Sequence, residues 1–369
     1  TMSDEQSAWL KLALARVAAA PATALLAEFG DAATILRQKS KRLAQFGVSE
    51  RALEALARIK DDAVQAALAW AGENHNHLIA IDSDNYPPLL RETKDAPLLL
   101  YVKGNVDALH LPALAIVGSR NPTRGGIDNA SNFAAHLGKC GFVITSGLAQ
   151  GIDTAAHRGA LLSKAKTIAV LGHGIDRVYP AANRELAHEI INDGVLLSEY
   201  PLGTPPKREN FPARNRLISG LSLGVLVVEA AYRSGSLITA RLASEQGREV
   251  FAIPGSIHNP LARGCHRLIK DGAKLIESAA DIIDELRPLV GHLESLETGA
   301  DPADAATVER DPDYQKLLSI IGFEPASADD IAAEAGLTID QVSSMLLILE
   351  LEGDIEVLQG GRYSRLNKG

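Results

Sequence analysis

The chain has 369 residues, of which 46% are hydrophobic and 22% charged, the composition of a globular protein large enough for two or three domains. No run of about 18 apolar residues is present, which excludes a membrane-spanning helix, and the polar first residues lack a signal-peptide core. The net charge of −9 is uneven, because residues 112–285 carry 19 basic and 16 acidic side chains and residues 286–369 carry 6 and 16, so a polyanion would meet the middle of the chain.

The first part of the chain, residues 1–75, is expected to be a small helical domain. Apolar periodicity predicts helices over 9–19, 22–29, 32–38 and 50–71, with glycines near several helix ends. Few basic residues cluster there, so we expect a scaffold rather than a nucleic-acid reader. A bridge follows, with strands over 78–81 and 98–102 and a turn at 86–88.

The middle of the chain, residues 76–286, alternates buried-strand and helix patterns. Apolar runs predict strands over 113–117, 142–145, 167–171, 195–197, 225–228, 250–253 and 274–276. Between them, helical patterns cover 126–138, 152–162, 184–192, 236–246 and 265–271. Regular alternation of this kind predicts an α/β fold, a doubly wound parallel sheet with helices on both faces.

Small and basic residues follow the predicted strands, at the edge where open α/β sheets bind ligands. Backbone N–H groups, a helix N-terminus and guanidinium groups together favour a phosphate. The candidate site residues are Gly118, Ser119, Arg120, Ser146, Gly147, Arg214, Asn215, Arg216, Arg233, Ser234, Gly235 and Ser236. Three alternatives stay open: Gly235 and Ser236 could serve only close helix packing, Arg214 could simply be solvated, and Arg120 could bridge Asp153 or Glu229.

No catalytic, cofactor or metal site is predicted. Residues 118–123 lack the G-x-G-x-x-G fingerprint, and no acidic residue ends the second strand of the domain. Asp153 and His157 share a helix face without a third ligand, and Ser198-Glu199 has no adjacent nucleophile–base pair. The two cysteines, Cys140 and Cys265, have neither zinc nor disulfide spacing, so we expect packed thiols in a reducing cytoplasm.

In the last part of the chain, the sequence predicts a linker followed by a winged helix-turn-helix. Residues 287–312 are rich in Ala, Asp and Pro without periodicity. Within residues 313–369, helices over 314–321, 327–334 and 339–351 precede a hairpin of 355–358 with 362–364, and Ser327 caps the second helix. The third helix is acidic where a DNA-reading helix would be basic, so a protein-contact role is favoured.

Eight motifs along the chain together resemble one family, the DNA-processing protein DprA, also called Smf. They are IVGSR (116–120), SGLAQGIDTAAH (146–157), TIAVLGHGID (167–176), YPAAN (179–183), SEYPLG (198–203), FPARNRLISGLS (211–222), VVEAAYRSGSLITA (227–240) and GREVFAIPGS (247–256). The resemblance covers most of the chain and is densest over 116–277.

The resemblance implies an extended Rossmann core, a SAM-like helical N-terminal domain and a C-terminal winged helix. It also implies a non-enzymatic homodimer that binds single-stranded DNA without sequence preference, protects incoming DNA and loads the recombinase RecA during natural transformation. The family's phosphate-contacting arginine falls on Arg120. Two positions depart from the family: Ala181 stands where many relatives have Lys, and residues 17–23 lack a Pro-Gly-Ile-Gly hairpin.

A second class of function is kept as the alternative. Nucleotide-processing enzymes of the lysine-decarboxylase-like type, which are phosphoribohydrolases, use a related sheet with a P-G-G-x-G-T turn followed by Glu. Here the matching turn is YRSGSLIT, which favours the binder. Only Tyr179, Tyr200, Phe211 and Tyr232 lie near the predicted edge in sequence, so we expect phosphate contacts to dominate binding.

Overall fold

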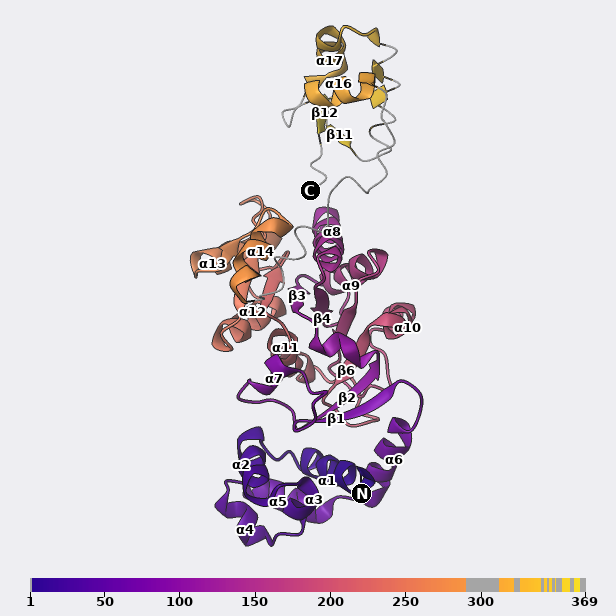
Figure 1. Ribbon diagram of the computed structural model, residues 1–369. Coiled ribbons are helices and arrows are strands. Elements are labelled where there is room, and N and C mark those ends of the chain that lie inside the picture. Colours follow the sequence, from indigo (N-terminus) through magenta and orange to yellow (C-terminus); the bar gives the residue numbers. More distant parts are fainter. Residues whose placement is uncertain are drawn as a thin grey trace. The chain divides into compact units, whose positions relative to one another are not determined.

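The computed structural model describes residues 2–289 and parts of 312–365, namely 312–321, 326–339, 342, 343, 345, 346, 349, 354–358 and 362–365. The chain divides into two compact units, Thr1–Glu294 and Ser295–Gly369, which are described separately below (Figure 1). The division falls within residues 287–312, where a linker is expected. Most of that predicted linker lies outside the described residues. In the parts of the chain that are described, no helix is long and apolar enough to cross a membrane.

Six short helices form the N-terminal part of the first unit. They are α1 (Met2–Leu14), α2 (Ala19–Phe29), α3 (Ala32–Leu36), α4 (Ser40–Gln45), α5 (Glu50–Arg58) and α6 (Asp61–Ala71). Two sequence predictions are wrong in detail. The first helix ends before residue 19, because Arg16 has a φ of 58° and the Val17 N–H reaches back to the Leu12 carbonyl. The helix expected over 50–71 is two helices, because Ile59 and Lys60 are extended.

A nine-stranded sheet forms the centre of the first unit. Its strands are β1 (Asn76–Ala80), β2 (Leu99–Gly104), β3 (Ala113–Val117), β4 (Val143–Ser146), β5 (Thr167–Val170), β6 (Val195–Ser198), β7 (Gly224–Val227), β8 (Glu249–Ala252) and β9 (Lys274–Leu275). Their order is β1-β2-β6-β5-β4-β3-β7-β8-β9. Strands β3 to β9 pair in parallel, and β1 and β2 add an antiparallel edge. The chain changes direction across the sheet between β3 and β7, which is the switch point of a doubly wound fold.

Helices cover both faces of the sheet, as the alternating pattern predicted (Figure 1). In β3 the buried side chains alternate, so that Ala113, Ala115 and Val117 enter one core and Leu114 and Ile116 the other. The second core packs against α8 (Arg124–Lys139), α9 (Ile152–Leu162) and α14 (Ala279–Leu286). The first packs against α10 (Arg184–Asp193), α11 (Asn210–Gly220), α12 (Gly235–Glu245) and the N-terminal helices.

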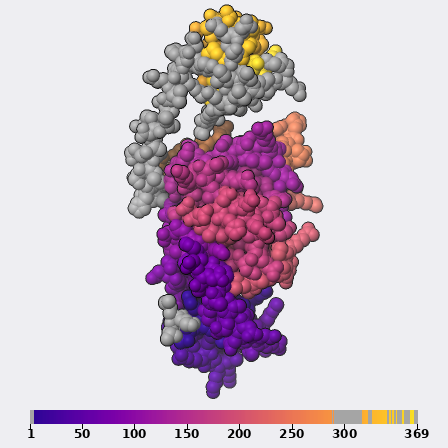
Figure 2. Space-filling model, turned by 90° about the vertical axis from the view of Figure 1, so that its right-hand side faces the viewer, coloured from indigo at the N-terminus to yellow at the C-terminus, as the bar shows by residue number. Residues whose placement is uncertain are grey.

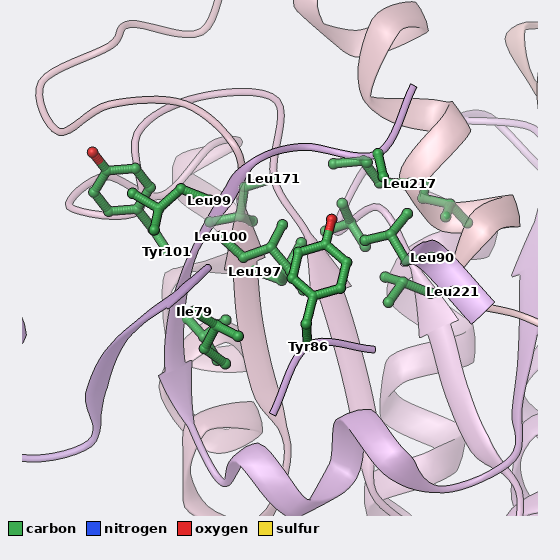
Figure 3. Packing of buried hydrophobic residues seen from close by; sticks show 14 of the residues in the cluster. Ile79, Tyr86, Leu90, Leu99, Leu100, Tyr101, Leu171, Leu197, Leu217 and Leu221 are labelled. Carbon is green, nitrogen blue, oxygen red and sulfur yellow. The ribbon is translucent and has the colours of Figure 1, made fainter. Parts of the chain in front are cut away.

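The larger core joins the antiparallel edge of the sheet to α11 and to the N-terminal helices. On the surface of this unit, the N-terminal residues, indigo in Figure 2, lie directly against the segments that follow them. Figure 3 shows the Tyr86 ring beside Leu90, Leu217 and Leu221, and the Tyr86 hydroxyl donates to the Pro97 carbonyl at 2.7 Å. The Trp9 indole N–H donates to Asp82 at 3.2 Å and ties α1 to the sheet-bearing segment. Besides these elements, α7 (Pro88–Arg91) and α13 (Arg263–Lys270) complete the helices of this unit.

The second unit has the element order of a winged helix. It contains α16 (Pro312–Ile320), β10 (Ala326–Ser327), α17 (Ala328–Ala335), β11 (Ile355–Leu358) and β12 (Arg362–Arg365), with the three strands paired antiparallel in the order β10-β12-β11. The Ser327 cap and the hairpin are confirmed, since the Ser327 side chain accepts from the Asp330 N–H. The third predicted helix, 339–351, lies partly outside the described residues.

Candidate nucleic-acid interface

The loop after β3 carries the first three predicted site residues and lies at the switch point. The Ser119 N–H donates to the Glu229 carbonyl at 2.7 Å, and the Ser119 carbonyl accepts from Ile152 at 3.1 Å. The expectation that the Ser119 amide is free to hold a phosphate is therefore wrong. Both backbone groups of Ser119 instead join β3 to the ends of β7 and α9.

Arg120, the next residue of this loop, is exposed and forms no ion pair with any residue that the structure describes. Its guanidinium carbon lies 5.7 Å from the centroid of the Phe211 ring. The alternative of a bridge to Asp153 or Glu229 is not seen, because both carboxylates bond elsewhere. The charge of Arg120 is thus available to an anionic partner.

The Phe211 ring beside Arg120 contacts a second aromatic ring, that of Tyr179, and we call these two side chains the aromatic platform. Their ring centroids are 5.7 Å apart with planes inclined by 42°. Tyr179 is 49% exposed, and Phe211 is partly exposed at the start of α11. An exposed guanidinium next to one exposed and one partly exposed ring suits a nucleic-acid strand, because bases stack on the rings while the cation holds phosphate.

Arg214, predicted to face the ligand, is instead only 3% exposed. Its Nη1 donates to the carbonyls of Gly147, at 2.8 Å, and Val170. Burial lowers the pKa of Arg214 to about 10, and the charge of Asp153 opposes that shift. A side chain at Gly147 would lie 2.7 Å from the guanidinium, so only glycine leaves room for it. Arg214 therefore joins α11 to the ends of β4 and β5 from inside.

Asp153 organises the loop after β4. Its Oδ2 accepts from the N–H groups of Gly147 at 3.1 Å and Ala149 at 3.4 Å. Burial raises the pKa of Asp153, and Arg214 acts against that rise. Ser146 is fully buried and donates to the Ile116 carbonyl at 2.6 Å. Ser146 and Gly147, predicted as phosphate contacts, thus have internal bonds instead.

His157 lies on the same helix as Asp153 and is also buried. Its Nδ1 lies 2.7 Å from the Thr167 hydroxyl, and burial lowers the pKa of His157 to about 3, so the ring is neutral. No group of three or more His, Cys, Asp or Glu residues with the arrangement of a metal site occurs among the residues described.

Arg216 is also withdrawn from the predicted edge. Its Nε pairs with Asp95 Oδ2 at 3.1 Å, and its Nη2 pairs with Glu199. Burial raises the pKa of Glu199, and the charge of Arg216 acts in the opposite direction. The prediction that Arg216 offers an open fork to phosphate is wrong, because two carboxylates already hold it.

At the start of α12, two of the predicted site residues, Arg233 and Gly235, are exposed. Arg233 is exposed and has no ion pair within the described part of the chain. Ser234 caps the helix by accepting from the Ser236 N–H at 3.3 Å. The Ser236 residue itself is buried. Gly235 is exposed, and a Cβ atom at this position would meet none of the described residues beyond its own helix and chain neighbours within 4 Å. The Asn215 Nδ2 lies 3.5 Å from the Gly235 carbonyl oxygen.

The structure therefore divides the predicted site into two groups. Arg120 and Arg233 keep exposed cationic side chains, whereas Ser119, Ser146, Gly147, Arg214, Arg216 and Ser236 build the frame beneath. Two exposed cations just before α11, Lys207 and Arg208, were not among the predicted site residues. It also treated Glu229 only as a partner for Arg120. A lone acidic residue directly after a buried strand is the signal that could have singled it out.

Comparison with known proteins agrees with this architecture. The family model for DNA recombination-mediator protein A matches residues 77–287, and that for the DprA winged helix domain matches residues 301–361. Protein Smf of Escherichia coli K12 is 43% identical over 331 residues, which cover 88% of this chain and 87% of that protein. DNA processing protein DprA of Streptococcus pneumoniae is 52% identical over 206 residues, covering 56% and 73%.

Two solved structures share the fold. The crystal structure of DprA from Streptococcus pneumoniae has a TM-score of 0.67 at 42% identity and covers 75% of this chain and 96% of that one. DprA from Helicobacter pylori, a structure described for its single-stranded DNA binding mode, has a TM-score of 0.53 at 33% identity, covering 58% and 97%. By the extent of the family match, the identity to Smf and the shared fold, the chain belongs to the DprA/Smf family of DNA-processing proteins.

Proposed function

We propose that the chain binds single-stranded DNA at the edge formed by Arg120 and the aromatic platform. The observation that carries this proposal is the guanidinium of Arg120, which is exposed, forms no ion pair with a described residue and lies 5.7 Å from the Phe211 ring centroid. Phosphate contact by a cation combined with stacking on aromatic rings is the usual basis of sequence-tolerant single-strand binding. The single-stranded DNA binding mode named for the Helicobacter pylori relative supports the same class of ligand.

The proposal extends to a recombination mediator that acts as a homodimer, protects incoming DNA and loads RecA during natural transformation. Membership of the DprA family supports this part. Its test is the assembly of RecA on single strands already coated by a single-strand-binding protein. Faster assembly with the chain than without it is expected, and no acceleration at any concentration would contradict the mediator role.

The alternative of a nucleotide-processing enzyme needs a free carboxylate at this edge. Glu229 is the acidic residue that follows β7, but it precedes the matching turn instead of following it, and both of its carboxylate oxygens accept hydrogen bonds from Thr123. A carboxylate held in this way is poorly placed to act as a general base, which must reach a proton on the substrate. This contact pattern favours the binding role.

Single-stranded DNA should bind more tightly than duplex DNA, and the affinity should fall steeply with salt. Each phosphate contact on a single strand contributes roughly −0.7 to the slope of log K against log salt concentration. Fluorescence anisotropy with labelled oligo-dT and with a duplex of equal length, across a salt series, measures both quantities. Equal affinity for the two probes, or binding that salt does not change, would contradict the proposal.

Deletion of residues 287–369 should leave the affinity for single-stranded DNA unchanged, or raise it at low salt. The physical reason is charge, since residues 286–369 carry 6 basic and 16 acidic side chains and Asp329 and Asp330 lie at the exposed start of α17. The same anisotropy assay compares the truncated and full chains. A large loss of affinity in a truncated chain with an unchanged melting temperature would show that the winged helix contacts DNA.

A further inference from the structure

Glu229 holds the segment that carries Arg120 at both of its ends. The Glu229 carbonyl accepts from the Ser119 N–H at 2.7 Å, just before Arg120. Its carboxylate accepts from Thr123 on the other side, with Oε2 at 2.9 Å from the Thr123 N–H and Oε1 at 2.6 Å from the Thr123 hydroxyl. One residue 106 positions away in sequence therefore fixes both ends of residues 119–123.

The residues around Glu229, namely Thr123 and Gly126, hold its carboxylate and leave room for it. Glu229 is 9% exposed, and Thr123 in turn caps α8 by accepting from the Gly126 N–H at 3.0 Å. A negative charge beside the first turn of a helix is stabilised by the helix dipole. A Cβ atom at position 126 would lie 2.5 Å from the Glu229 carboxylate, so the absence of a side chain there makes room for it.

A fixed segment matters for Arg120 because its side chain forms no ion pair in the described part of the chain. Ordering a mobile loop at the moment of binding reduces affinity, whereas a loop that is already held in the bound conformation avoids that loss. The contacts of Glu229 supply such a constraint on both sides of Arg120, at Ser119 and at Thr123. Both oxygens of the Glu229 carboxylate accept hydrogen bonds from Thr123, so we do not expect this carboxylate to contact the nucleic acid itself.

We propose that Glu229 is a positioning residue for single-strand binding: it fixes residues 119–123 so that Arg120 is presented to the DNA phosphates. This inference rests on the proposed function. It is opposed by a simple electrostatic expectation, since removal of a negative charge near a DNA site should raise affinity. The two views predict opposite signs for the same substitution.

Four proteins test the inference: the full chain, Glu229→Ala, Arg120→Ala and the double variant, each titrated with labelled oligo-dT at fixed salt. Glu229→Ala is expected to weaken binding roughly fivefold or more, within the range of coupling found for residues in one network. In the Arg120→Ala background the same substitution should have no further effect. Glu229→Gln should restore affinity to within roughly twofold of the full chain, since an amide can still accept from the Thr123 N–H and donate to its hydroxyl.

Two controls separate positioning from charge and from folding. Glu245→Ala removes the same charge from an exposed residue of α12 that pairs with Arg241 on the same helix, and it should leave affinity within roughly twofold. If Glu229→Ala fails to fold, Thr123→Ala releases the hydroxyl contact instead and should show the same dependence on Arg120. Thermal melts of each protein report folding independently of DNA.

Each result has a definite reading. Losses that add in the double variant would overturn the inference, because Glu229 would then act independently of Arg120. A gain of affinity in Glu229→Ala would overturn it in favour of electrostatic repulsion. A full-length chain that does not bind oligo-dT would overturn the proposed function itself. Binding by the full chain with additive losses would overturn only the role of Glu229.

Discussion

Arg214→Met is expected to destabilise the first unit by about 3–5 kcal/mol, because two hydrogen bonds from a charged donor are lost and a buried carboxylate loses a compensating charge. Arg214 is 3% exposed, and the Asp153 carboxylate beside it would remain buried without its opposing charge. The carbonyls of Gly147 and Val170 would each lose a hydrogen bond from a charged donor. Methionine fills much of the volume but replaces none of these bonds.

The measurement is the urea dependence of unfolding, followed by a probe of the α/β core, together with the melting temperature. The matched control is Arg233→Met, which removes the same charge from an exposed arginine of the same sheet edge and should change stability by less than about 0.5 kcal/mol. Adding Asp153→Asn to Arg214→Met should recover part of the loss, because no uncompensated charge then stays buried. An Arg214→Met protein as stable as the full chain would show that the buried guanidinium contributes little to stability.

The positions of the central strands β3 to β7 were predictable because each is a short apolar run buried on both faces. The predicted helix 152–162 and strand 113–117 have the observed bounds, and the end of β3 lies at the switch point as expected. Helix α11 was missed, because Pro212 and the flanking glycines and prolines resemble a loop. Proline is nevertheless tolerated in the first turn of a helix, where its missing N–H has no partner to lose.

The side-chain roles at the edge were less predictable than its location. Arg214 and Arg216 stand two positions apart on α11 and so leave the helix on different sides, which sequence alone cannot relate to the sheet. Because Gly147 has no side chain, the Arg214 guanidinium has room to lie inside the domain. The carboxylates of Glu199 and Asp95 form ion pairs with Arg216. Local motifs identify the ligand-binding edge, whereas contacts distant in sequence decide which cations remain exposed.

Arg120→Ala is expected to reduce the affinity for oligo-dT roughly 5- to 150-fold, the equivalent of about 1–3 kcal/mol for hydrogen bonds to a charged group. Arg120 is exposed, forms no ion pair with a described residue and lies 5.7 Å from the Phe211 ring centroid. Its loss should therefore cost at most about 1 kcal/mol of stability, the value of an exposed cation–π contact. The slope of log K against log salt should become shallower by roughly 0.7 if one phosphate contact is removed.

Anisotropy with oligo-dT and a thermal melt of the same samples measure the affinity and the stability of Arg120→Ala together. Lys139→Ala is the matched control, because it removes one exposed charge from the far end of α8, away from the loop that holds Arg120. Arg120→Lys should fall between, since it keeps the charge but loses the planar fork that can bind two phosphate oxygens. Full affinity in Arg120→Ala would remove Arg120 from the binding site. Arg233, Lys207 and Arg208 would then be the remaining exposed cations named above to which phosphate contact could be assigned.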